Sequence, residues 1–152
     1  MCYIYDMQLV STLDAWFEQQ LNDLDVEAST RAYIVNLLAR TDVKDNLHRE
    51  SVVLLFAQAR AKSSFDSYRR VGDWSMWTHI VCPELINDEH ELLQTLGRLS
   101  YYACHRMLRG EWRLYEELAD SMVDIVDDVR SRLGIVLRTQ YNQSAMILPR
   151  IV

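Results

Sequence analysis

The residue of this sequence most able to do chemistry is Asp73, because it is a carboxylate placed among aromatic side chains. Arg69 and Arg70 precede it by four and three residues. On a helix either arginine shares a face with the carboxylate, so the spacing predicts an ion pair. A carboxylate in apolar surroundings can also act as an acid or base, or line a ligand pocket.

Two hypotheses for Asp73 follow from this pattern. In the structural one, the ion pair orients a central helix, and Gly72 lets a neighbouring helix approach closely. In the functional one, Asp73 faces a cavity that holds a small molecule. The candidate polar cluster or pocket combines charged and aromatic residues of this segment with two residues of a later one: Arg69, Arg70, Asp73, Trp77, Arg98 and Tyr101.

The histidines and cysteines form no recognisable metal or haem motif. The histidines are His48, His79, His90 and His105, and no two of them have the three- or four-residue spacing with which one helix face binds a metal ion. The sequence contains no Glu-x-x-His, no Cys-x-x-Cys and no glycine-rich phosphate loop. It therefore predicts no cofactor and no metal site, and a metal or haem bundle with ligands from separate helices is only a third hypothesis.

The charge of the chain argues against a nucleic-acid partner. The net charge is −6 and the isoelectric point is about 5.1, whereas affinity for phosphates needs clustered positive charge. The group of Arg98, Arg106, Arg109 and Arg113 is interpreted as a helix end with a solvated face. Three distant cysteines, and the lack of an apolar run of about 20 residues, predict a cytoplasmic protein with no membrane partner.

Apolar residues recur at three- and four-residue steps along most of the chain, which predicts an all-α fold. The expected helices cover residues 12–24, 29–40, a segment ending near 62, 64–81, 87–110 and 115–133. The segment 64–81 is apolar on two faces and should lie in the middle of the fold. We therefore expect an irregular bundle of about six helices around this central, aromatic-rich helix.

The end of the chain is expected to depart from the helical pattern. Gly134 is a natural stop for the last helix, so residues 1–134 are predicted to form a single helical domain. Residues 135–152 contain two apolar triplets and no helical period. They are predicted to be a C-terminal extension that packs on the domain or on another subunit. The alternative is a short extended segment formed by the two termini, with residues 3–5 as its other strand.

Gly97 lies inside the helix expected at 87–110, between Leu96 and Leu99. A glycine in a helix interior costs about 1 kcal/mol relative to alanine unless close packing requires it. The sequence therefore predicts a tight contact between helices at Gly97.

Three motifs lie in the middle of the chain. They are Phe65-x-x-Tyr68-x-Arg70-x-Gly72-Asp73, then Pro83-Glu84, then Leu96-Gly97-Arg98 with Tyr101-Tyr102. This pattern resembles an uncharacterised all-helical family of bacterial and phage proteins, whose members carry a Gly-Asp helix, a Phe-Pro turn and a later Tyr-rich helix. The turn departs from the family, since it reads Ile80-Val81-Cys82-Pro83 where members tend to have Gly-x-Phe-Pro. The resemblance covers roughly residues 29–132 and implies a helical fold but no established activity.

These observations rank three functions. No catalytic motif is recognised, so we first expect a nonenzymatic helical interaction or assembly protein. Its aromatic content and apolar tail favour self-association, most simply as a homodimer. The alternative is a small-molecule-binding or enzymatic helical bundle with a pocket near Asp73, and the third is the metal or haem bundle.

Overall fold

The computed structural model describes residues 14–39, 52–81, 83–86, 89–110 and 112–142, and within these ranges all regular structure is helical. This confirms the all-α prediction. A helical segment at residues 14–20 comes first. The elements that follow are α2 (Ala28–Ala39), α4 (Val52–Lys62), α5 (Phe65–Val81), the short 3-10 helix η1 (Pro83–Ile86), α6 (His90–Met107), α7 (Leu114–Asp120) and α8 (Met122–Asn142).

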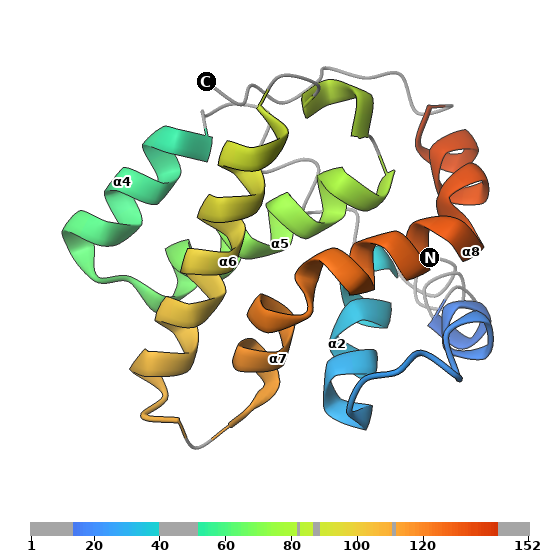
Figure 1. The fold of residues 1–152 in the computed structure, drawn as a ribbon, viewed down its shortest axis with the longest axis horizontal. Helices are drawn as coiled ribbons and strands as arrows, with labels where there is room; N and C mark the ends of the chain where they lie inside the picture. The colour runs from blue at the N-terminus through green and yellow to red at the C-terminus, as the bar shows by residue number, and fades with distance from the viewer. Residues whose placement is uncertain (1–13, 40–51, 82, 87–88, 111, 143–152) are drawn as a thin grey trace, which may run out of the picture.

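The central helix is α5, as the sequence predicts. It contacts α2, α4, η1, α6 and α8, and every residue from Val71 to Val81 is buried. In Figure 1, α6 crosses α5, while α4 and α8 lie toward its opposite ends. Because apolar burial is the main favourable term in folding, this fully buried part of α5 forms the centre of the hydrophobic core.

Both ends of α5 lie where the sequence places them. The side-chain oxygen of Ser64 accepts a hydrogen bond from the backbone N–H of Ser67 at 3.2 Å, which is the geometry of an N-cap. Ser63, with φ of +48°, turns the chain between α4 and α5. At the other end, Pro83 opens η1. Proline disfavours helical geometry in the residue before it, so α5 ends at Val81.

The predicted helix at 115–133 is interrupted, and this part of the prediction is wrong. α7 ends at Asp120 and α8 begins at Met122, with Ser121 between them. Near this break the carbonyl oxygen of Ala119 accepts a hydrogen bond from Nε of Arg98 on α6, at 3.0 Å. Carbonyl groups in the last turn of a helix lack partners inside the helix. The side chain of Arg98 supplies one and ties the end of α7 to α6.

The predicted stop at Gly134 is also wrong. α8 continues to Asn142. Residues 135–142 are therefore helical and form neither an irregular tail nor a strand. A glycine inside a helix costs about 1 kcal/mol, whereas burying a leucine contributes about 1.5–3 kcal/mol. Leu137 is 0% exposed, and its burial outweighs the cost of Gly134. Residues 143–152, and residues 3–5 of the alternative, lie outside the described part of the chain.

The first predicted helix is shorter than expected at its C-terminal end. The helical segment ends at residue 20 rather than 24, yet Leu21 and Leu24 are buried as the apolar pattern requires.

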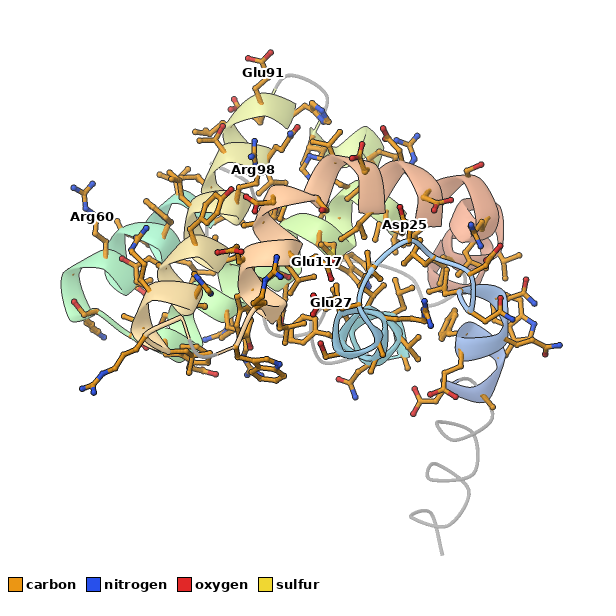
Figure 2. The ribbon with its side chains drawn as sticks, turned by 60° about the horizontal axis from the view of Figure 1, so that its bottom comes forward. Asp25, Glu27, Arg60, Glu91, Arg98 and Glu117 are labelled. Carbon is orange, nitrogen blue, oxygen red and sulfur yellow. The ribbon has the colours of Figure 1, made fainter. Side chains whose placement is uncertain are left out.

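At the start of α2, the backbone N–H of Glu27 donates a hydrogen bond to Oε1 of Glu117 on α7, at 3.0 Å. Figure 2 shows Glu117 lying beside Glu27, whereas Arg60 and Glu91 extend away from the molecule. Within the described ranges, no helix is both long enough and apolar enough to cross a membrane.

Two glycines allow α5 and α6 to approach each other closely. A Cβ atom added to Gly97 would lie 2.5 Å from Cβ of Ser75 on α5. A Cβ atom added to Gly72 would lie 2.5 Å from Cε1 of Tyr101 on α6. Protein interiors are close-packed and cannot accommodate such overlaps without moving a helix. The predicted tight contact at Gly97 is confirmed, and Gly72 has the role expected of it.

Candidate functional site

Asp73 lies in a buried cluster of tyrosines drawn from several helices. Its side chain is 2% exposed as part of α5. Its Oδ1 atom accepts hydrogen bonds from the hydroxyl of Tyr101 on α6, at 2.8 Å, and from the hydroxyl of Tyr33 on α2. The ring of Tyr115 on α7 packs edge-on against Tyr33, with ring centroids 5.7 Å apart. One carboxylate therefore joins α2, α5 and α6, and Tyr115 adds α7.

The tyrosines of this cluster act as hydrogen-bond donors. Burial, and then the negative charge of Asp73, raise the pKa of both Tyr33 and Tyr101 far above the usual value of 10. Burial likewise raises the pKa of Tyr115 to about 12, and that of the nearby Cys104 thiol to about 12. At neutral pH all four groups are protonated. A cluster with neither a phenolate nor a thiolate has no activated nucleophile, and its chemistry fits a structural role.

The structure brings Tyr101 to Asp73 and shows hydrogen bonds to other residues for two of the predicted arginines. Tyr101 contacts Asp73 directly, and Trp77 is buried four residues further along α5. Arg70 is partly buried on the same helix. Nη2 of Arg69 forms an ion pair with Oδ1 of Asp66, at 2.8 Å, and Arg98 donates to α7 instead.

The negative charge of Asp73 affects the pKa of Arg69, although Arg69 is ion-paired with Asp66. Burial alone would lower the pKa of its guanidinium, but the negative charge of Asp73 and the hydrogen bond with Asp66 raise it. Tyr33, 40 residues away in the chain, is a partner of Asp73 that the sequence did not reveal, whereas Tyr101, 28 residues away, belongs to the predicted cluster.

The predicted arginine group is dispersed along α6 and α7. Arg113 lies 3.7 Å from a carboxylate oxygen of Glu116 and 3.9 Å from one of Glu27. Nε2 of His105 lies 3.1 Å from the other oxygen of Glu116. Arg106 and Arg109 are exposed at the end of α6. The acidic residues of this region thus balance part of its positive charge, which agrees with a helix end beside a solvated face.

A pocket opens at another part of the central helix, between α5, α6 and α8. Its volume is about 170 Å³. The lining residues are His79 from α5, His90 and Gln94 from α6, and Met122, Val123, Val126 and Asp127 from α8. An apolar cavity of about 150 Å³ is large enough to bind benzene. The pocket therefore has room for a molecule built on one small ring.

His79 forms the buried part of this pocket wall and is only 4% exposed. Its Nδ1 atom lies 2.7 Å from the backbone carbonyl oxygen of Ser75, one turn earlier in α5. Its Nε2 atom is buried and has no hydrogen-bond partner among the residues that the structure describes. Burial lowers the pKa of His79 below the usual 6.5, and the backbone groups of Ser75 and His90 oppose this change only in part. The imidazole is therefore neutral at neutral pH.

His90 lies on the solvent side of His79. The two imidazole rings pack edge-on with their centroids 4.8 Å apart, and His90 is exposed. Although Asp127 also lines the pocket, no three histidine, cysteine or carboxylate side chains among the described residues are arranged to hold a metal ion. The arrangement favours an organic ligand with one polar group, since Met122, Val123 and Val126 give the pocket an apolar wall.

The sequence did not reveal this site. His79 and His90 are eleven residues apart and lie on different helices, so neither the three- nor the four-residue spacing of a shared helix face could pair them. Two features were visible, namely a histidine in the helix expected to be central and, four residues before it, a backbone carbonyl oxygen that can accept a hydrogen bond from the ring. Both are ordinary features of a buried helix and do not indicate a pocket by themselves.

Comparison with family models, with curated proteins and with solved structures gave no match. The resemblance to an all-helical family of bacterial and phage proteins stays a prediction.

Proposed function

We propose that this protein binds a small organic molecule in the pocket between α5, α6 and α8. This keeps the second of the functions expected from the sequence and places the ligand beside His79 instead of Asp73. The observation that carries the proposal is a buried imidazole in the pocket wall whose Nε2 atom has no hydrogen-bond partner within the described part of the chain. A buried polar atom without a partner costs about 1–3 kcal/mol, and a ligand that satisfies it recovers that cost.

The Asp73 cluster supports this assignment because its polar groups, unlike Nε2 of His79, have hydrogen-bond partners. There, the carboxylate and the tyrosine hydroxyls satisfy one another, and their contacts join helices that are distant in sequence. At the pocket, by contrast, Nε2 of His79 has no hydrogen-bond partner among the described residues, and the His79 side chain lines the pocket wall. Polar groups that are mutually satisfied specify a fold, whereas an unsatisfied group in a concave site is suited to a ligand.

The homodimer and the cytoplasmic location stay predictions, and the mass of the protein in solution would test the first.

Blocking the pocket should weaken the binding of single-ring probes. Val123 lines the pocket and is 44% exposed, so Val123→Trp should fill its mouth and weaken binding at least tenfold without disturbing the core. We would titrate the protein with phenol and with toluene and follow backbone amide NMR signals, expecting the changes to concentrate at the lining residues.

Val136 provides a matched control for this experiment. It lies on the same helix, is 48% exposed and does not line the pocket. Val136→Trp should bind the probes as the unmodified protein does. If neither probe shifts the signals of the lining residues, or if Val123→Trp binds as well as Val136→Trp, the pocket is not a binding site.

A further inference from the structure

The hydrogen-bonding state of His79 specifies more about the ligand than the pocket volume does. A carbonyl oxygen accepts hydrogen bonds and cannot donate them. The 2.7 Å contact with the Ser75 carbonyl therefore requires the proton of the neutral imidazole to be on Nδ1. The other nitrogen, Nε2, is then unprotonated and carries a lone pair. It can only accept a hydrogen bond, so the group that completes it must be a donor.

The remaining walls restrict the body and the charge of the ligand. Met122, Val123 and Val126 supply apolar surface on the α8 side. The carboxylate of Asp127 and the lone pair of His79 both disfavour a negatively charged group. A carboxylate ligand would therefore bring like charges together and could not donate to Nε2. A neutral, compact and mainly apolar molecule agrees with all of these walls.

On this geometry, and resting on the proposed binding function, we infer that the ligand is a neutral single-ring molecule with one O–H or N–H group that donates to Nε2 of His79, as a phenol or an azole does. For the donor to reach Nε2, the ring of His90 has to move aside. Nε2 is shielded from water, and the exposed ring of His90 packs against the ring of His79. Exposed side chains change rotamer within nanoseconds, so this movement does not slow binding.

Three probes of similar size separate the ligand class from the existence of the site. Phenol has the donor, toluene lacks it, and benzoate replaces it with a negative charge. We expect phenol to bind at least tenfold more tightly than toluene, and benzoate to bind more weakly than either. If toluene or benzoate binds as tightly as phenol, the pocket is a binding site but the donor requirement is wrong. If none of the three binds, the proposed binding function itself fails.

Replacing the imidazole tests whether His79 is the acceptor. His79→Phe keeps a ring in the wall but removes both nitrogens, so the preference for phenol over toluene should fall to about one while toluene binding persists. A preference that stays tenfold in this variant would overturn the assignment. Should this variant not fold, the unmodified protein gives the same information. Phenol should shift the Nε2 nitrogen resonance of His79 and toluene should not, and an unshifted resonance with phenol bound would also overturn it.

Discussion

Asp73→Ala should lower the free energy of unfolding by about 3–5 kcal/mol, because it removes the acceptor shared by two buried hydroxyls. Tyr101 is fully buried, and its hydroxyl donates to Oδ1 of Asp73 at 2.8 Å. Tyr33 donates to the same oxygen atom. Each buried donor left without a partner costs about 1–3 kcal/mol. Equilibrium unfolding in urea, followed by circular dichroism, measures the change.

Asp73→Asn should have a smaller effect, about 1–3 kcal/mol. The amide oxygen can still accept from both hydroxyls, but hydrogen bonds to a neutral acceptor are weaker than those to a carboxylate. Asp66→Ala is the matched control, since Asp66 is an aspartate of the same helix that is exposed and ion-paired with Arg69. Exposed pairs contribute about 0–1 kcal/mol. Asp73→Ala with the stability of the unmodified protein would show that the cluster does not hold the fold together.

Gly97→Leu should be the second strongly destabilising change, with a loss of about 3 kcal/mol. Any side chain at this position meets the side chain of Ser75, whose hydroxyl donates to the carbonyl oxygen of Leu93 at 2.9 Å. Overpacking of a closely packed contact costs about 1–3 kcal/mol and sometimes more. Leucine is intrinsically better than glycine in a helix, so a net loss must come from the contact between α5 and α6.

The expected loss corresponds to a melting temperature lower by roughly 6–12 °C in a chain of this size, which a thermal melt resolves. Thr95→Leu places the same residue on an exposed position of the same helix, and its effect should remain within about 0.5 kcal/mol. A melting temperature of Gly97→Leu that is unchanged or higher would mean that α5 and α6 are not as close at Gly97 as the structure shows.

The sequence predicts this fold best where local signals and burial agree. α5 has an N-cap at Ser64, Pro83 just beyond its end, and apolar residues on two faces, and it is the central helix of the structure. The two errors in α7 and α8 arise where a tertiary contact outweighs a local signal. Arg98 of α6 donates a hydrogen bond to a carbonyl oxygen at the end of α7. The burial of Leu137 stabilises α8 beyond Gly134. Neither contact can be read from a single periodic pattern.

The candidate site was predictable only in part, for a related reason. Asp73 is buried as expected of a carboxylate in an apolar helix, but its tyrosine partners come from α2 and α6. The pocket is harder still, because its walls are single residues or short stretches of three helices. The lone pair of His79 depends on a backbone carbonyl, a group that every residue has. A site whose residues are brought together only by the tertiary fold leaves no local motif in the sequence.

The protonation of His79 tests the proposed site most directly, because the ligand chemistry depends on a neutral imidazole with its proton on Nδ1. Long-range proton–nitrogen NMR correlations distinguish the two neutral tautomers and the charged ring. We expect Nδ1 to be protonated and Nε2 bare at neutral pH. Burial disfavours the charged form, so protonation should occur only as the pH falls below the usual pKa of 6.5. A proton on Nε2 at neutral pH, or a pKa of 6.5 or higher, would contradict the proposed site.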